Sequence, residues 1–441
     1  MLTKERVGTI FKLALPIGVA VSSTLIMSLV DLAMVAPLGN HATAAVGLSV
    51  FTHTLLLSLV AGIGPAVQGL VARRRGQGST EPKCLPLNGG LMGAVLAGIP
   101  LTILGYFMAP IVLGLISSDP EVTRIGIPFL RVLYMALIAA GMNFSFKGHW
   151  AGMERPNIYM MIILFMNVLN FCGNWVLIHG RFGFPALGAT GAALSTAFAS
   201  YVGVFINMII AWPRFRHEGF LTAWPGKKLL VRIFTLGLPA GMQDFFFSAG
   251  YIVFYWIVGQ VGTAELAAVN VQVRISLLLS IVAMALGSAS ATLVSRTIGQ
   301  GDPAGAAQWG WDAGKLGVIV ITLLAAPLVI FARFFLAVFL SDPHTIEIAL
   351  LPWQIVTSLA GLGSLIYIFA YTLVSVGDGS RVAIISFGTQ WLLFLPAVWF
   401  VGPYLHYGLL QISLVQVVYG TIATILITSI WADGRWKKIK I

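Results

Sequence analysis

Two acidic residues, Asp31 and Asp244, stand inside long apolar stretches of this sequence, where a carboxylate is unexpected. An ionisable group in such a stretch is costly to bury, and its usual explanation is a functional site that faces the protein interior. The other acidic residues can be placed in loops or at the ends of predicted helices. Asp31 and Asp244 are therefore the first candidates for chemistry, and that chemistry is the binding of a cation.

Asp31 shares one predicted helical face with Thr24 and Ser28, because the three residues are spaced by four and then three positions. A second stripe with this kind of spacing consists of Asn167, Asn170 and Asn174. Carboxylate and amide oxygens are hard ligands that suit Na⁺, and a desolvated carboxylate can also carry a proton. Two interpretations of the asparagines stay open: they belong to an ion site, or they only join helices by hydrogen bonds.

Asp244 begins another polar face, which continues through Ser248 and Tyr251 at helical spacing. This carboxylate either binds a cation or a cationic small molecule, or is only paired with a neighbour such as Gln243. An aromatic side chain such as Tyr251 suits the binding of flat lipophilic cations.

The elements that carry these residues must be membrane helices. Of all residues 58% are hydrophobic and 9% are charged, and the mean hydropathy is +0.92, far outside the range of a water-soluble domain. Charged residues are absent over intervals such as 32–72, 84–118 and 382–432, each long enough for at least one span of roughly 20 residues. We predict an all-α integral membrane protein with twelve transmembrane helices, near 9–37, 43–72, 88–116, 122–147, 157–180, 186–212, 231–260, 264–297, 311–340, 345–374, 382–401 and 407–432.

The basic residues behind the net charge of +11 are predicted to lie mainly on one side of the membrane. If both termini are cytoplasmic, every Lys and Arg falls on an inner loop or helix end except Arg124, Arg131, Arg181, Arg274 and Arg333. This positive-inside pattern predicts a multi-pass protein with both termini in the cytoplasm. It also accounts for the basic loops without nucleic acid, for which the sequence holds no binding motif.

The sequence repeats itself at an offset of 223 residues, which aligns Pro16 with Pro239, Gly64 with Gly287, and Ser118-Asp119-Pro120 with Ser341-Asp342-Pro343. Six spans per repeat give both halves the same direction, so we expect lobes related by a pseudo-twofold axis along the membrane normal. We expect an N-lobe at 1–212, a cytoplasmic linker at 213–230 and a C-lobe at 231–441. The repeat partner of Asp31 is Phe254, so the two lobes differ in chemistry.

Motifs of enzymes and metal sites do not accompany these acids. HExxH, GxSxG and Walker A patterns are absent, and Cys84 and Cys172 lack metal-ligand spacing. Catalysis needs paired acids, metal ligands or a nucleophile with its base, whereas only isolated acids occur. We expect no enzyme activity, no cofactor, and no metal other than, at most, Na⁺ at Asp31.

An ordered set of short motifs runs along the chain: Ala14-Leu15-Pro16, Val30-Asp31, Leu38-Gly39, Ala44-Ala45-Val46-Gly47, Gly191-Ala192-Ala193-Leu194-Ser195-Thr196, Leu238-Pro239, Leu266-Ala267-Ala268 and Ile298-Gly299-Gln300-Gly301-Asp302. By this set the chain resembles, over essentially its full length, the multidrug and toxic compound extrusion (MATE) family and its NorM-like bacterial members. The resemblance implies a secondary active exporter of the bacterial inner membrane, which antiports amphiphilic, cationic drugs against H⁺ or Na⁺ by alternating access. It implies a role in antibiotic resistance, contact with membrane lipid and a monomeric state.

The resemblance also assigns a cation site to the first lobe. In the family this site is the first-helix acid, supported by two polar residues of the fifth helix and a threonine of the sixth. The corresponding residues here are Asp31, Asn170, Asn174 and Thr196.

The second lobe departs from the family pattern. Phe247 stands where NorM-like members carry an acid, and no acid occurs between Glu347 and Asp378. Asp244, one turn before Phe247, is the candidate substitute, and Gln243 and Tyr251 complete the predicted C-lobe cation or substrate site. These differences favour H⁺ over Na⁺ as the coupling ion.

Two other classes of function remain as alternatives. A flippase for lipid-linked oligosaccharides, from the same wider superfamily, would need buried cations for a pyrophosphate, and the candidates Arg131, Arg274 and Arg333 are scattered. An intramembrane enzyme lacks its catalytic groups here, and a channel fits poorly with two separately polar lobes.

Overall fold

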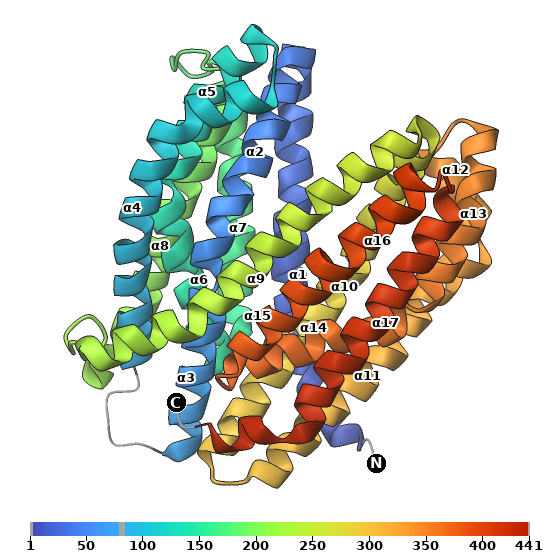
Figure 1. Cartoon of the computed structure of the whole chain (residues 1–441). Coiled ribbons are helices and arrows are strands. Elements are labelled where there is room, and N and C mark those ends of the chain that lie inside the picture. The colour runs from blue at the N-terminus through green and yellow to red at the C-terminus, as the bar shows by residue number, and fades with distance from the viewer. Residues whose placement is uncertain (1–2, 79–83, 440–441) are drawn as a thin grey trace. The chain divides into compact units, whose positions relative to one another are not determined.

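The computed structural model describes residues 3–78 and 84–439, and all regular structure in these residues is helical (Figure 1). Ten of the described helices are long and apolar enough to cross a membrane, and two bent helix pairs bring the number to twelve. The predicted all-α membrane fold with twelve spans is confirmed. Two basic residues predicted for the inner side, Lys83 and Lys440, lie outside the described residues.

The first repeat contains α1 (Lys4–Val35), η1 (Ala36–Leu38), α2 (Asn40–Ala61), α3 (Ile63–Gln77), α4 (Leu85–Ile116), α5 (Pro120–Met135), α6 (Leu137–Gly152), α7 (Pro156–His179), α8 (Ala189–Phe215) and η2 (Arg216–Glu218). The second contains α9 (Gly226–Val261), α10 (Thr263–Gly299), α11 (Pro303–Ile330), α12 (Ala332–Phe339), α13 (Pro343–Ser358), α14 (Ala360–Ser375), α15 (Gly379–Phe387), η3 (Gly388–Phe394), α16 (Leu395–Trp399), η4 (Phe400–Tyr404), α17 (Leu409–Asp433) and η5 (Arg435–Lys438).

The helix boundaries repeat at the offset found in the sequence, and α5 and α13 show the cause. Each follows an aspartate and begins with a proline, which suits the first helical position because it has no N–H to leave unpaired. Asp119 accepts a hydrogen bond from the Glu121 N–H at 2.8 Å, and Asp342 accepts one from the Thr345 N–H at 2.9 Å. The hydrogen bond from the Glu121 N–H is the main reason that the pKa of Asp119 is lowered. The hydrogen bond from the Thr345 hydroxyl is the main reason that the pKa of Asp342 is lowered.

A repeated glycine explains how neighbouring helices approach closely in both halves. A Cβ atom at Gly64 would lie 3.1 Å from the Phe144 carbonyl oxygen, and one at Gly287 would lie 3.1 Å from the Tyr367 carbonyl oxygen. Phe144 and Tyr367 are themselves separated by the repeat offset. The same backbone contact therefore recurs, and it is close enough to favour a residue without a side chain.

The fourth and tenth predicted spans, 122–147 and 345–374, are each broken into two helices. α5 and α6 are bent by 43°, and α13 and α14 by 49°. At the first break, side chains donate to backbone carbonyls: Thr102 donates to the Tyr134 carbonyl and Tyr201 to the Met135 carbonyl, each at 2.8 Å. Such inserted donors are a recognised cause of sharp bends.

The chain forms two compact units, which we call the first unit (Pro16–Gly241) and the second unit (Met1–Leu15 with Met242–Ile441). Both α1 and α9 pass from one unit into the other near the repeated prolines, Pro16 and Pro239. The lobe boundaries expected from the sequence, at 1–212, 213–230 and 231–441, stay a prediction.

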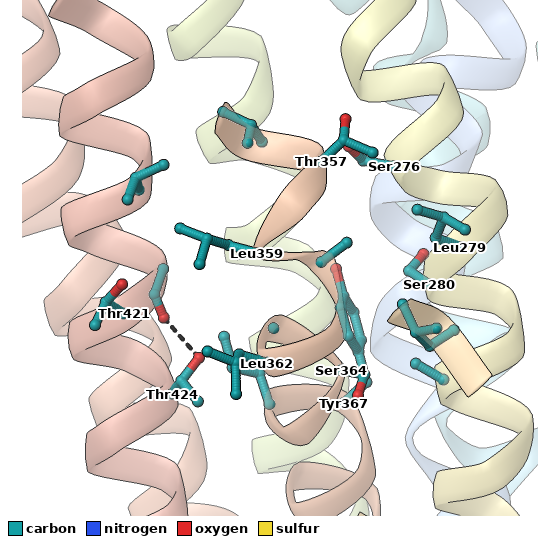
Figure 2. Close-up of a pocket in the computed structure, with 18 of the residues that line it drawn as sticks. Ser276, Leu279, Ser280, Thr357, Leu359, Leu362, Ser364, Tyr367, Thr421 and Thr424 are labelled. Carbon is teal, nitrogen blue, oxygen red and sulfur yellow. Dashed lines mark hydrogen bonds between the residues drawn. The ribbon is translucent and has the colours of Figure 1, made fainter. Parts of the chain in front are cut away.

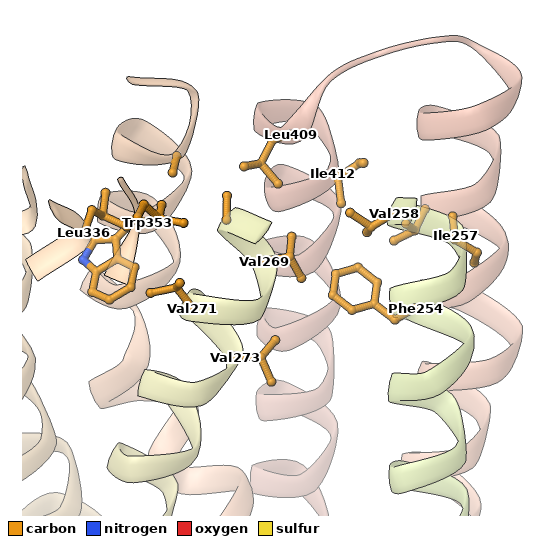
Figure 3. Packing of buried hydrophobic residues seen from close by; sticks show 14 of the residues in the cluster. Phe254, Ile257, Val258, Val269, Val271, Val273, Leu336, Trp353, Leu409 and Ile412 are labelled. Atoms are coloured by element: carbon orange, nitrogen blue, oxygen red, sulfur yellow. The ribbon is translucent and has the colours of Figure 1, made fainter. Parts of the chain in front are cut away.

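The second unit has an apolar core to which α9, α10, α12, α13, η3, α16 and α17 contribute. Figure 3 shows Phe254 of α9 and Val269 of α10 beside Ile412 of α17, while Trp353 of α13 packs near Leu336 of α12. The Trp353 indole N–H donates to the Leu328 carbonyl at 2.8 Å, which satisfies its polar atom inside the core.

An acid that the sequence analysis placed at a helix end is buried inside a helix. α11 begins at Pro303, earlier than the predicted start at 311, because Asp302 caps it by accepting from the Gly305 N–H at 2.8 Å. Asp312 is consequently internal and only 2% exposed. Its carboxylate forms an ion pair with Arg6, whose guanidinium also lies over the Trp309 ring, 4.3 Å from its centroid. The first turns of α1 are thereby fixed within the second unit, to which they belong.

Replacing Arg6 by Ala should lower the stability of the protein, because it leaves the buried Asp312 carboxylate without its charge partner. Losing one member of a buried pair costs roughly 3–5 kcal/mol. Thermal unfolding of the purified protein in detergent should show a lower Tm, and adding Asp312→Asn should recover most of the loss. Arg124→Ala, which breaks an exposed pair with Glu121, is the matched control and should leave Tm nearly unchanged. Equal Tm values for the Arg6 and Arg124 variants would contradict this role of the ion pair.

Candidate functional site

The first unit brings Asp31 of α1 against two asparagines of α7. The Asn174 side-chain amide donates to Asp31 Oδ1 at 2.5 Å. The Asn170 amide satisfies its hydrogen bonds when its oxygen faces Thr196 and its nitrogen faces Asp31. In this orientation the nitrogen donates to the same Asp31 oxygen at 2.8 Å. Two amide donors from successive turns of one helix therefore hold one carboxylate oxygen of another helix.

The fourth predicted residue, Thr196, completes this group from α8. In the same orientation, the Asn170 amide oxygen accepts from the Thr196 N–H at 3.1 Å and lies 3.0 Å from the Thr196 hydroxyl. The four residues assigned by the family resemblance are thus joined in one chain of contacts across α1, α7 and α8. Their role in cation coupling stays a prediction.

Close packing of α7 and α8 is the local condition for this geometry. Gly173, between the two asparagines, faces Ser195 of α8, and a Cβ atom at this glycine would lie 2.3 Å from the Ser195 hydroxyl oxygen. Ser195 also donates to the Asn170 backbone carbonyl at 2.8 Å. Sequence reasoning did not single out Ser195, although it directly precedes Thr196 in a small-residue stretch of the kind that packs against another helix.

The electrostatic setting of Asp31 is unusual for a carboxylate in an apolar helix. Asp31 forms no ion pair with any Lys, Arg or His in the described part of the chain. Asn174 is fully buried, and its Oδ1 atom has no hydrogen-bond partner among the described residues. Buried acceptors are normally paired, so a carboxylate and an unpaired amide oxygen together favour a cation or a proton.

The other polar residues of the predicted stripes do not join this group. Thr24 and Ser28 lie on α1 with exposed side chains, and Thr24 donates back to the Ala20 carbonyl at 3.0 Å. Asn167 is half-buried and takes no part in the hydrogen bonds to Asp31. Across residues 3–78 and 84–439, no cluster of three His, Cys, Asp or Glu side chains could hold a metal ion. The oxygen atoms available to Na⁺ belong to Asp31, Asn174 and Thr196.

The three residues predicted for the second-lobe site, Gln243, Asp244 and Tyr251, all lie on α9. Gln243 donates to the Ser386 hydroxyl of α15 at 3.2 Å. Tyr251 packs edge-on against Phe247, with ring centroids 4.9 Å apart. Asp244 lies on an exposed position of α9. A cation or substrate role for these three residues stays a prediction.

Side chains from a π-helical segment hold α9 at this level, and sequence reasoning missed them. In η3, Gln390 donates to the Phe247 carbonyl and Trp391 to the Phe246 carbonyl, each at 3.1 Å. Both acceptors are backbone atoms inside a helix. Nothing in the sequence pattern marks a helix carbonyl as an acceptor for a distant side chain, so no signal was available to find these contacts.

Comparison with known proteins adds independent findings. The family model described as MatE matches residues 16–176 and 239–400. A probable multidrug resistance protein NorM of Thermotoga maritima is 26% identical and aligns with 99% of this chain and 95% of its own. A protein of the same name from Brucella suis is 26% identical, covering 76% of this chain and 73% of that protein.

Solved structures share the fold. A MOP superfamily transporter from Pyrococcus furiosus matches with a TM-score of 0.86 and 18% identity, covering 98% of this chain and 96% of that one. The MATE transporter VcmN of Vibrio cholerae, in its bent form, matches with a TM-score of 0.86 and 19% identity, covering 98% of both chains.

Gly173→Ala should separate α7 from α8 and loosen the contacts around Asn170. The added methyl group would overlap the Ser195 hydroxyl, and overpacking of this kind costs roughly 1–3 kcal/mol. Thermal unfolding in detergent should show a lower Tm than the wild type. Gly47→Ala on α2, where a Cβ atom meets nothing within 4 Å, is the matched control and should keep the wild-type Tm. A wild-type Tm for Gly173→Ala would mean that this close approach is not needed.

Proposed function

Since the chain belongs to the MatE family, we propose that it is a multidrug exporter, which antiports amphiphilic, cationic drugs against H⁺ or Na⁺. The family match, the NorM-named relatives and the shared fold support a multi-pass membrane transporter. Membership in a family of transporters also sets aside the enzyme and channel alternatives.

One observation carries the ion-coupling part of the proposal: the Asp31 carboxylate is held by amides and has no basic partner in the described chain. A carboxylate fixed by an arginine would already have its positive charge and could not exchange it. Amide donors orient the carboxylate and leave it free to take up and release a small cation. If the affinity of Asp31 for the cation differs between the inward-open and outward-open states, ion exchange is linked to alternating access.

We infer that H⁺ is the coupling ion. Na⁺ prefers several oxygen ligands, and the site offers one carboxylate with neutral amide and hydroxyl oxygens from Asn174 and Thr196. A proton needs only the carboxylate. The second lobe adds no acid between Glu347 and Asp378, so a second ion site of the NorM-like type lacks its residues.

The proposal extends to the cellular setting. The basic inner loops support a bacterial inner membrane location with both termini in the cytoplasm. A monomer surrounded by lipid, without a cofactor, is sufficient for the mechanism. The flippase alternative gains no support from Arg131, because its Nε donates to the Tyr106 carbonyl at 3.2 Å and its guanidinium lies over the Tyr106 ring.

Asp31→Asn should abolish ion-driven efflux while the protein still folds, because the amide keeps the shape of the side chain but cannot bind or release a proton. Ethidium transport in everted vesicles, driven by an imposed pH gradient, should fall to background. A Na⁺ gradient alone should drive little transport in the wild type, and the opposite result would identify Na⁺ as the coupling ion. Asp342→Asn, which keeps a residue that caps helices equally well, is the control and should transport normally. Unchanged efflux by the Asp31 variant would refute its role.

A further inference from the structure

The segment that joins α8 to α9 exposes a mixture of aromatic and basic side chains. The membrane span that contains α8 ends at Glu218, and the span formed by α9 begins at Gly226. Residues 219–225 therefore have to lie at a membrane surface, and Figure 1 shows them at the end of the first unit where α4 begins. We call residues 212–228, which are this connection and the adjoining helix ends, the linker surface.

One side chain of α4 fixes the backbone of the connection. The Asn88 amide donates to the Gly219 and Ala223 carbonyls, each at 2.8 Å. Its oxygen accepts from the Leu221 N–H at 3.0 Å. An asparagine side chain has two N–H donors and one oxygen, so every polar group of Asn88 is used on the connection. The linker surface is therefore held against the first turn of α4.

Two further contacts anchor the same segment. Phe220 is fully buried, and its ring centroid lies 6.3 Å from that of Phe146 on α6 and 6.4 Å from that of Trp212 on α8. Gly89 of α4 lies against Pro225, since a Cβ atom at this glycine would be 3.5 Å from the proline side chain. Because the segment is fixed along its length, the side chains that it exposes keep defined places.

Large apolar side chains of the linker surface are exposed. Trp224 is 71% exposed, Leu221 50% and Trp212 44%. Leu221 also has a φ of +57°, a backbone region that leucine rarely adopts and that costs free energy, and its half-exposed side chain gains little burial in return. Tryptophan is enriched where proteins meet the membrane–water interface, because its ring is apolar and its N–H is polar. These side chains suit insertion among lipid headgroups.

Basic side chains flank the apolar ones and have no charge partners. Arg214, Arg216, Lys227 and Lys228 are all exposed, and none of them forms an ion pair within residues 3–78 and 84–439. Glu218 is the only acid between residues 212 and 228. Each Lys or Arg close to an anionic membrane surface strengthens binding to it. The linker surface therefore combines positive charge with apolar side chains.

The end of the second repeat shows that a basic helix end does not by itself need this arrangement. There Trp436 is fully buried and stacks on Trp431, with ring centroids 4.1 Å apart, and its indole N–H donates to the Trp431 carbonyl at 2.8 Å. The Arg435 guanidinium lies 3.6 Å from the Asp433 carboxylate. The positive-inside pattern accounts for basic residues at the ends of both repeats. It does not account for exposed tryptophans beside unpaired charges at the end of the first repeat.

We propose that the linker surface binds the headgroups of anionic phospholipids. The negatively charged headgroups contact the four basic side chains, while Trp224 and Leu221 enter the interface beside the acyl chains. A soluble anion would use the charges but not the exposed apolar side chains, so the structure favours a lipid. The inference needs only that α8 and α9 cross a membrane, and it does not depend on the exporter function.

Quenching of tryptophan fluorescence tests this binding, because Trp224 lies within the linker surface. The purified full-length protein is reconstituted into phosphatidylcholine vesicles that contain a small fraction of brominated phosphatidylglycerol or, in a parallel series, the same fraction of brominated phosphatidylcholine. Bromine quenches a tryptophan only at close range. The difference between the wild type and Trp224→Phe gives the quenching of Trp224, and Tm confirms that each variant is folded.

Brominated phosphatidylglycerol should quench Trp224 more strongly, with an affinity roughly threefold to tenfold above that of phosphatidylcholine. Lys227→Gln with Lys228→Gln should lower this ratio roughly twofold or more, because two of the four charges are removed. Lys437→Gln with Lys438→Gln removes the same charge from two exposed lysines at the end of the second repeat, and as the matched control it should keep the ratio. About 1 M NaCl should lower the wild-type ratio towards one.

Three results would overturn the proposal. Equal quenching of Trp224 by the two brominated lipids would show that the surface has no preference for anionic headgroups. Equal losses in the two lysine pairs would assign the preference to the overall charge of the protein. Loss of the preference on adding inorganic phosphate at constant ionic strength would show that the surface binds a free anion. Ethidium efflux from vesicles reports on the exporter function separately.

Discussion

A carboxylate inside an apolar helix bundle is the constraint on which the rest of this structure depends. Such a group is tolerated only if it is solvated by the protein, paired with a cation or neutralised by a proton. Asn170 and Asn174 solvate the carboxylate by donating to one oxygen of Asp31. No basic residue of the described chain pairs with it. In the proposed mechanism the missing positive charge comes from outside the protein, and this requirement is the physical basis of coupling.

The two halves share a backbone plan and differ in chemistry. The repeat partner of Asp31 is Phe254, which is only 1% exposed and sits in the apolar core of the second unit (Figure 3). The position that holds a carboxylate in one half therefore stabilises packing in the other. The second half instead has a cavity without charged lining residues beside the break between α13 and α14 (Figure 2). Duplication explains the common boundaries, and divergence at single positions gives the two halves different chemistry.

The sequence predicted the fold well because its signals are local or repetitive. Apolar runs, turn residues and the 223-residue offset were enough for twelve spans, and helical spacing placed Asp31 and the two asparagines on defined faces. Thr196 came from the family resemblance alone. The start of α11 was missed although Asp302-Pro303 is the same start signal as Asp119-Pro120, and so Asp312 was assigned to a helix end. Its partner Arg6 is 306 positions away, and spacing rules cannot show such a contact. The cavity depends on a bend between α13 and α14, which no residue pattern predicted.

Proton release on drug binding tests the central claim most directly. Ethidium is added to the purified protein in weakly buffered, Na⁺-free detergent solution near neutral pH, and the change in pH is recorded. If the drug and the proton bind competing states, the wild type should release up to about one proton per bound ethidium, and Asp31→Asn should release none. The same release from both proteins would show that another group carries the proton and would contradict the assignment of Asp31.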